Sequence, residues 1–196
     1  MSVPPAPPLL LASRSPQRRA ILEQLGVPFE VVVPRYEEEQ AGGGPLETVR
    51  EHARGKARSV ADVARGEPAL GVDTEVVLDG RVFGKPADPT EAEAMLEDLG
   101  GRTHEVVSGV CLVTRAWEVV EHDVTLVTFR PLDARDLAAY VGTGEWQGRA
   151  GGYAIQGRGA GLVSRIEGDY LNVVGLPGAL LVRLLADRFP GVYGFG

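Results

Sequence analysis

The sequence has only one cysteine, Cys111, and no apolar run long enough to span a membrane. A single cysteine cannot form an internal disulfide, which excludes a disulfide-stapled secreted scaffold and fits a reducing compartment. The proline-rich start, residues 1–8, carries no basic region of the kind that opens a secretory signal. We therefore expect a cytoplasmic protein with no membrane partner.

Positive charge is also scarce, and almost all of it is arginine. The chain has 20 Lys and Arg against 27 Asp and Glu, a formal net charge of -7, and its only lysines are Lys56 and Lys85. This balance repels a polyanion, and no basic cluster alternates with aromatic residues, so we expect no nucleic-acid partner. A small anion that binds together with a metal ion is compatible with this charge balance. The two lysines either fill positions that need a compact ammonium or simply escaped the arginine bias.

Several standard catalytic motifs are missing as well. The sequence has no G-x-x-x-x-G-K-[ST], no strand-linked G-x-G-x-x-G and no G-x-S-x-G, which excludes P-loop, Rossmann and hydrolase-elbow chemistry. The three histidines, His52, His104 and His122, are scattered along the chain. We interpret them as structural or surface residues, since no two of them have the spacing of a metal-ligand pair.

The hydrophobic patterns predict one domain over residues 1–196, with residues 1–8 as a flexible end. Helical and strand-like segments mix without strict βαβ repetition, which favours a mixed-sheet α/β or α+β fold over a doubly wound one. Expected strands cover 9–12, 29–33, 69–72, 75–78, 104–114, 118–129, 162–166 and 170–174. Expected helices start at Pro16, Leu46, Pro89, Asp133 and Pro177, the second of them reaching Gly66, and the stretch 142–161 is expected to carry turns and a strand edge.

Three segments are candidates for phosphate chemistry. The Ser13 to Arg19 segment places hydroxyls and arginines at a strand-to-helix turn, where free N–H groups attract anions, although an ordinary capped helix has the same pattern. Asp73 directly follows a predicted strand and is either a functional carboxylate or a turn residue. Residues 37–39 are all Glu and form either a metal-binding or a solvated acidic loop. Together these segments favour metal-assisted phosphate chemistry.

Seven blocks spread over residues 9 to 186 carry a family resemblance. They are Leu11-Ala12-Ser13-Arg14-Ser15-Pro16-Gln17-Arg18-Arg19, Gly55-Lys56-Ala57, Gly71-Val72-Asp73-Thr74, Gly84-Lys85-Pro86, Gly101-Arg102-Thr103-His104, Ala150-Gly151-Gly152-Tyr153-Ala154-Ile155-Gln156-Gly157 and Val173-Val174-Gly175-Leu176-Pro177. In this order the blocks resemble the signature of the Maf family of nucleotide pyrophosphatases. Several blocks in a fixed order are far more specific than any single motif.

The resemblance implies an ITPase/Maf-like mixed α/β fold, with an elongated sheet and a nucleotide cleft between two lobes, often as a homodimer. It implies hydrolysis of a nucleoside triphosphate to the monophosphate and pyrophosphate, with Mg²⁺ or Mn²⁺ as cofactor. Carried over by position, Asp73 is the expected general base and Glu38 a metal-binding or catalytic carboxylate. Both are expected metal ligands, and Lys56 and Lys85 are expected to neutralise the triphosphate.

Substrate contacts follow from the same resemblance. Ser13 and Arg18 are expected to hold phosphate, and Thr74 and Gln156 to set the nucleobase preference. The block around Gln156 resembles the branch that acts on dTTP and UTP, and its amide offers a donor and an acceptor to a pyrimidine edge, or else bonds its own loop. Gln17 replaces an arginine of the usual Ser-Pro-Arg-Arg run.

A second departure is Gly148-Arg149, which stands where this branch commonly has Asp-Lys. An alternative function is a nucleotide-sensing regulator of septum formation and cell division. Such a regulator needs the arginines and Gln156 but not a general base.

Overall fold

The computed structural model describes residues 6–38, 42–61, 64 and 66–195. Its centre is a mixed seven-stranded sheet in the order β2-β1-β3-β5-β6-β7, with β4 paired to β3. The strands are β1 (Leu9–Leu11), β2 (Phe29–Val31), β3 (Ala69–Leu78), β4 (Arg81–Phe83), β5 (Thr103–Val113), β6 (Glu118–Phe129) and β7 (Val163–Glu167). The helices are α1 (Pro16–Gln24), α2 (Pro45–Ala61), α3 (Pro89–Leu99), α4 (Ala134–Val141), α5 (Tyr170–Val174) and α6 (Gly178–Arg188), with 3-10 turns η1 (Ala150–Gly152) and η2 (Arg158–Leu162).

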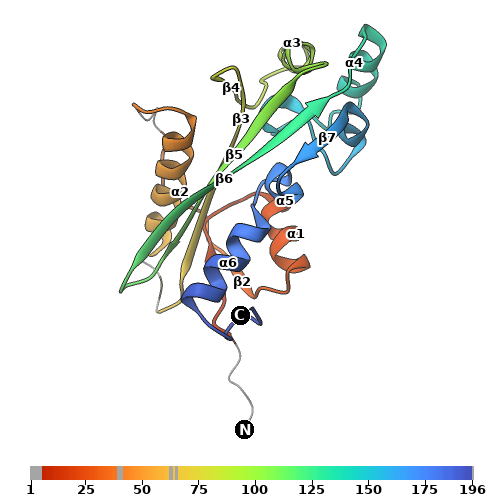
Figure 1. Ribbon diagram of the computed structural model, residues 1–196. Coiled ribbons are helices and arrows are strands. Elements are labelled where there is room, and N and C mark those ends of the chain that lie inside the picture. Colours follow the sequence, from red (N-terminus) through yellow and green to blue (C-terminus); the bar gives the residue numbers. More distant parts are fainter. Residues whose placement is uncertain (1–5, 39–41, 62–63, 65, 196) are drawn as a thin grey trace.

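Three long antiparallel strands, β3, β5 and β6, run the length of the molecule and make the sheet elongated (Figure 1). β1 is parallel to both β2 and β3, so the sheet is mixed, as predicted. Helix α2 lies on one side of these strands, and α1 and α6 lie on the other (Figure 1). Among the described helices, none is both long and apolar enough to cross a bilayer.

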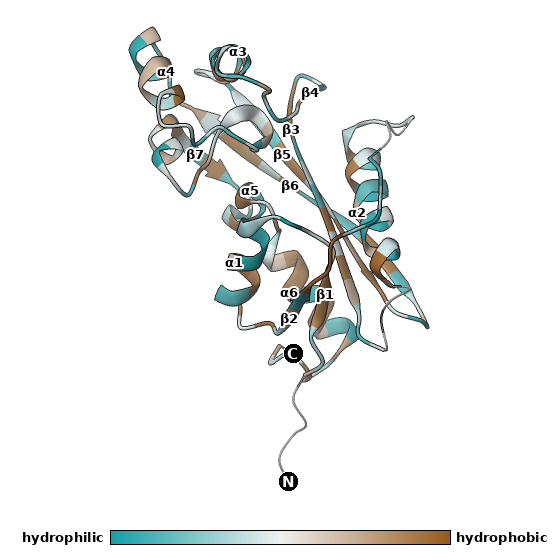
Figure 2. Cartoon of the chain, turned by 180° about the vertical axis from the view of Figure 1, so that it is seen from behind, coloured by the Kyte–Doolittle hydropathy of each residue, from teal (hydrophilic) through white to brown (hydrophobic). Residues whose placement is uncertain are grey.

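The two largest apolar clusters lie in different lobes of the molecule, and two smaller ones lie under α2. One core lies under α3 and α4 and includes Leu96 and Phe129, while the other lies under α1 and α6 and includes Leu22 and Leu181. Helix α1 is mostly teal, hydrophilic, in Figure 2, and Ile21 and Leu22 are its only buried residues. The predicted two-lobed mixed α/β fold is confirmed.

The sheet has an opening along one edge of β3. β5 pairs with one edge from Ala69 to Val77. The other edge pairs with β1 at Ala69 and Leu70 and with β4 only from Val76 onward. In the described part of the chain, no strand pairs with that second edge between these two contacts. The segment 71–75 therefore faces an opening between the lobes.

Three predicted elements were wrong. β3 runs unbroken through Asp73 and Thr74, so Asp73 lies within a strand and not at a strand's end. Residues 170–174 form helix α5, because the Asp169 carboxylate caps the helix start and overrides the β-branched pattern. The stretch 142–161 contains 3-10 turns and no strand edge.

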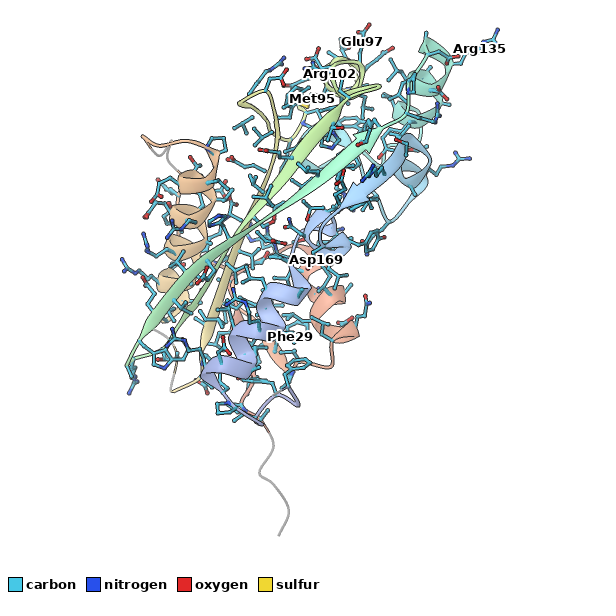
Figure 3. All side chains as sticks on the ribbon, viewed as in Figure 1. Phe29, Met95, Glu97, Arg102, Arg135 and Asp169 are labelled. Carbon is cyan, nitrogen blue, oxygen red and sulfur yellow. The ribbon has the colours of Figure 1, made fainter. Side chains whose placement is uncertain are left out.

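Other expected ends differ only in length. Helix α2 is described as far as Ala61, and Ala64 and Gly66 are not helical, while residues 62, 63 and 65 of the predicted helix end lie outside the described residues. Of the end that we predict to be flexible, residues 1–5 lie outside the described residues, and the carbonyl of Pro7 accepts a hydrogen bond from the Tyr193 hydroxyl at 2.9 Å. At the opposite end of the molecule, Arg135 on α4 projects away from the sheet (Figure 3).

Candidate active site

A cleft of about 660 Å³ lies at the opening beside β3. It is lined from both lobes, by residues 12–18 at the start of α1, by 148–150 and 153–156 around η1, and by 173–175 at the end of α5. Single residues from α2, β3, β5 and neighbouring loops complete the wall, namely Pro34, Tyr36, Glu38, Lys56, Thr74, Val76, Lys85 and Val106. Six of the seven sequence blocks contribute at least one residue to the lining of the cleft. The block Gly101-Arg102-Thr103-His104 contributes none.

Glycines bring α2 close enough to β3 to build one wall of this cleft. A Cβ atom on Gly71 would overlap the backbone carbonyl oxygen of Ala53 on α2. A Cβ atom on Gly55 would overlap the ring of Tyr36, so this glycine makes room for an aromatic side chain that lines the cleft. Because α2 lies directly on the strand, the side chain of Lys56 reaches Asp73.

Lys56 links two carboxylates. Its Nζ atom lies 2.6 Å from Oδ1 of Asp73 and 2.6 Å from Oε1 of Glu38. The side chains of Lys56 and Asp73 are 10% and 12% exposed, whereas that of Glu38 is 52% exposed and lines the cleft. Charge-assisted hydrogen bonds of this length are strong, and removing one partner leaves a buried charge uncompensated. The structure thus joins Asp73, Glu38 and Lys56, three predicted catalytic residues, in one cluster.

Two further titratable groups adjoin Asp73. His52 Nδ1 lies 3.2 Å from Oδ2 of Asp73, and the imidazole is buried on α2 one turn before Lys56. Glu75 follows on β3 and, at two residues' spacing, points to the same face of the sheet as Asp73. Its Oε2 atom is buried and has no hydrogen-bond partner among the described residues. Burial, and next the charge of Asp73, raise the pKa of Glu75.

The start of α1 forms the opposite wall. Ser15 caps the helix, and its hydroxyl donates to Oε1 of Gln17 at 3.0 Å. Ser13 Oγ accepts the backbone N–H of Ser15 at 3.2 Å and a guanidinium N–H of Arg18 at 3.2 Å. These bonds hold both hydroxyls at a helix N-terminus that faces the cleft, where the dipole favours an anion.

Arg18 also links α1 to β3 and to the residue that follows α5. Its Nε donates to the carbonyl of Gly175 at 2.9 Å and its Nη2 to Thr74 Oγ1 at 3.3 Å. Gly175 has φ 130°, which a residue with a side chain rarely adopts, so the glycine is needed to aim this carbonyl. Burial lowers the pKa of Arg18, and Asp73 and Glu38 oppose that shift. With three of its five N–H groups bonded internally, Arg18 keeps two for a phosphate.

Thr74 points to the opposite face of β3 from Asp73 and also lines the cleft. Its hydroxyl lies 2.8 Å from Ser108 Oγ on β5 and 3.3 Å from the carbonyl of Gly175. Gln156 is exposed and also lines the cleft. Its amide makes no hydrogen bond to any residue that the structure describes, so the alternative that Gln156 bonds its own loop finds no support there.

Three cations of the cleft are unpaired within the described residues. Arg14, Lys85 and Arg149 line the cleft and make no ion pair with any side chain in the described ranges. Two further cations line the cleft: Lys56, which is ion-paired, and Arg18, which donates hydrogen bonds to neutral oxygens. Glu38 is the one carboxylate in the described lining. An overall acidic chain therefore concentrates positive charge in this cleft, which favours a polyanionic ligand.

A divalent cation fits beside these groups. Glu38, His52 and Asp73 each offer a ligand atom, and these atoms lie within 4.8 Å of one another. The buried, unpartnered oxygen of Glu75 adds a further acceptor nearby. Carboxylate oxygens are the ligands that Mg²⁺ and Mn²⁺ favour, so Glu38 and Asp73 suit the predicted role of metal ligands.

A comparison with models of known protein families shows the family to which the chain belongs. A model of the family described as "Maf-like protein" matches residues 8–188. The chain belongs to the Maf-like protein family. The resemblance seen in the sequence is thus confirmed.

Curated relatives match this chain over most of its length. A dTTP/UTP pyrophosphatase of Symbiobacterium thermophilum is 49% identical over 180 residues, covering 91% of this chain and 93% of the relative. The dTTP/UTP pyrophosphatase of Deinococcus radiodurans is 44% identical over 191 residues, 97% of each chain. A solved structure, the Staphylococcus aureus Ham1 protein, aligns over 62% of this chain and 71% of its own with a TM-score of 0.41 and 16% identity, a likeness too weak to add to the fold.

The structure brings together every predicted site residue that it describes. Ser13, Gln17, Arg18, Glu38, Lys56, Thr74, Lys85 and Gln156 line the cleft, and Asp73 lies directly behind Lys56. Arg14 also lines the cleft, Arg19 is exposed outside that lining, and Glu39 lies outside the described residues.

The sequence analysis did not place His52 or Glu75 in the site. We interpreted His52 as a structural or surface residue, but it contacts Asp73 and belongs to the possible cation cluster. The available signal was its spacing, because His52 and Lys56 are four residues apart on one helix and so share a face.

Proposed function

We propose that this protein is a nucleoside triphosphate pyrophosphatase that hydrolyses dTTP and UTP to the monophosphate and pyrophosphate. One observation carries the proposal: a cleft whose described lining has five cations and one carboxylate lies against the buried Lys56–Asp73 pair. Membership of the Maf-like family and relatives named dTTP/UTP pyrophosphatase support it.

In the proposed reaction, Asp73 accepts a proton from the water that attacks the α-phosphorus. Asp73 is only 8% exposed and is covered by Lys56 in the structure. A bound triphosphate attracts the ammonium of Lys56, and a shift of this flexible side chain toward the phosphates opens Asp73 to the water. The carboxylate stays oriented through His52, whose ring contacts the second oxygen.

The remaining cations stabilise the leaving pyrophosphate. Arg14, Lys85 and Arg149 have no ion-pair partner among the described side chains, so binding phosphate breaks no existing pair. Ser13 and the free N–H groups of Arg18 hold a phosphate at the start of α1. Positioning and preorganised charge account for most of the rate gain in such a site.

Glu38 and Asp73 hold the cation, which we propose to be Mg²⁺ or Mn²⁺. When bound, a divalent cation supplies positive charge to the phosphate oxygens and to the attacking water.

Base preference is assigned to Gln156 and Thr74, which both line the cleft. The unengaged amide of Gln156 offers one donor and one acceptor, as a uracil or thymine edge requires. Gln17 makes its bond to Ser15 and leaves its own N–H groups for substrate.

We also propose a cytoplasmic location, which the single buried Cys111 supports, and a homodimer, which follows from the family resemblance. Light scattering coupled to size-exclusion chromatography measures the mass in solution. A mass of about twice the 20.8 kDa chain supports the dimer, and a mass equal to the chain contradicts it.

The experiment that tests the function measures both pyrophosphate and orthophosphate released from dTTP, UTP, CTP, dATP and 7-methyl-GTP. Pyrophosphate released selectively from dTTP and UTP is the expected result. Release of orthophosphate contradicts the site of cleavage. Tight nucleotide binding without release of either product contradicts hydrolysis and favours the nucleotide-sensing regulator.

A further inference from the structure

His52 is a buried imidazole at the centre of the site that the proposed chemistry uses only as a support for Asp73. Its side chain is 9% exposed, and its Nδ1 lies 3.2 Å from Oδ2 of Asp73. The ring of Tyr36 packs edge-on against it, with 5.9 Å between ring centroids. The imidazole is thus held in one orientation with a ring nitrogen directed at a carboxylate oxygen.

This arrangement has the geometry of two ligands of one cation. Two neighbouring ligands in an octahedral shell, each about 2.1 Å from the ion, lie about 3 Å apart. The 3.2 Å between His52 Nδ1 and Asp73 Oδ2 is close to that spacing. Glu38 supplies the third ligand atom within 4.8 Å of the others.

Lys56 does not block this position. Its ammonium is bonded to Oδ1 of Asp73 and Oε1 of Glu38, which leaves the second oxygen of each carboxylate for a cation. Glu75 adds a third carboxyl group, with a buried and unpartnered Oε2 within electrostatic reach of Asp73 and His52.

We propose that His52 is a nitrogen ligand of the divalent cation, so that the site selects a first-row transition ion, Co²⁺ or Mn²⁺, over Mg²⁺. Mg²⁺ favours a shell of oxygens only, whereas an imidazole ligand raises the affinity for transition ions, more for Co²⁺ than for Mn²⁺. To bind, the neutral imidazole carries its hydrogen on Nε2 and presents the Nδ1 lone pair to the ion. The inference rests on the proposed function for the catalytic role of the cation. The identity of the ligand is independent of that function, because cation binding is measured without turnover.

The test uses the full chain with Co²⁺, Mn²⁺ or Mg²⁺, with and without a non-hydrolysable α,β-methylene triphosphate analogue. Affinities come from calorimetry, and the ligand type comes from the ¹⁴N modulation of the bound Mn²⁺ spin-echo signal. The variants are His52→Asn, which keeps a hydrogen-bond donor beside Asp73 but no imidazole, and His52→Gln as a second substitution if the first fails to fold. His122→Asn, an exposed histidine on β6, is the matched control.

Wild-type protein and His122→Asn are expected to bind in the order Co²⁺, Mn²⁺, Mg²⁺ and to show an imidazole ¹⁴N signal. In His52→Asn we expect this signal to vanish and the Co²⁺ and Mn²⁺ affinities to fall about 10-fold or more, with a much smaller change for Mg²⁺. Equal losses for all three ions, or no ¹⁴N signal in the wild type, overturn the assignment. Pyrophosphate release with no ¹⁴N signal refutes this inference alone, whereas an imidazole signal without hydrolysis refutes the proposed function alone.

Discussion

Asp73→Asn is the substitution whose effect the structure defines most closely. The amide has nearly the same shape, and its oxygen can still accept from Lys56, which also keeps its 2.6 Å contact to Glu38. The fold is therefore expected to persist. Asparagine cannot take a proton from water, and general-base catalysis contributes about 10²- to 10⁴-fold in rate. We expect kcat to fall by about 10³-fold, equal to about 4 kcal/mol of transition-state stabilisation, while KM changes little.

Glu38→Gln and Asp79→Asn complete the assay, which follows pyrophosphate release at saturating dTTP. Glu38 is the other carboxylate of the cluster and is 52% exposed, and Asp79 lies in the exposed turn between β3 and β4. Asp79→Asn is expected to keep wild-type turnover, and Glu38→Gln to lose less than Asp73→Asn. If Asp73→Asn stays within about 10-fold of wild type while Glu38→Gln loses more, the base is Glu38 and our assignment is wrong.

Three further predictions concern specificity, packing and pH. Gln156→Leu should lower kcat/KM for dTTP and UTP by about 10- to 100-fold because a contact to the base is lost. Gln147→Leu, which changes a residue outside the cleft, should not lower kcat/KM. Equal kcat/KM values for the two variants refute the role of Gln156. Gly71→Ala should cost about 1–3 kcal/mol in urea unfolding because its Cβ overlaps the Ala53 carbonyl, whereas Gly161→Ala, with open space around it, should cost far less. Burial lowers the pKa of His104 from 6.5 to about 4. Between these two pH values the unfolded chain therefore binds a proton that the folded chain does not bind. The free energy of unfolding should drop by about 3 kcal/mol as the pH falls from 7 to 4. A His104→Gln variant should lack that part of the pH dependence, and an unchanged slope contradicts the explanation.

The long elements of the fold were predictable from local patterns. β5 and β6 are continuous apolar or alternating strands. Helix α3 begins at Pro89 and is capped by Asp88, whose carboxylate accepts the N–H of Glu91, as the sequence spacing indicates. The break predicted in β3 was wrong because a carboxylate inside a strand is unfavourable unless it is paired. Lys56, 17 residues away in the sequence, provides that pairing, and no local pattern reveals it.

The prediction of the site residues depended on the family resemblance more than on the physical pattern of the sequence. Local reasoning found the capped helix start with Ser13 and the two rare lysines, but it could not place Asp73 beside Lys56. That contact depends on the close approach of α2 at Gly71, where the packing reason for the glycine is visible only in three dimensions. The unpaired state of Arg149 and the contact of His52 with Asp73 are likewise tertiary features.

The central claim, attack of water at the α-phosphorus beside Asp73, is tested most directly by hydrolysing dTTP in ¹⁸O-labelled water for a single turnover. Mass spectrometry then locates the label in the two products. We predict one ¹⁸O atom in dTMP and none in pyrophosphate. Label in the pyrophosphate, or in released orthophosphate, would contradict the account.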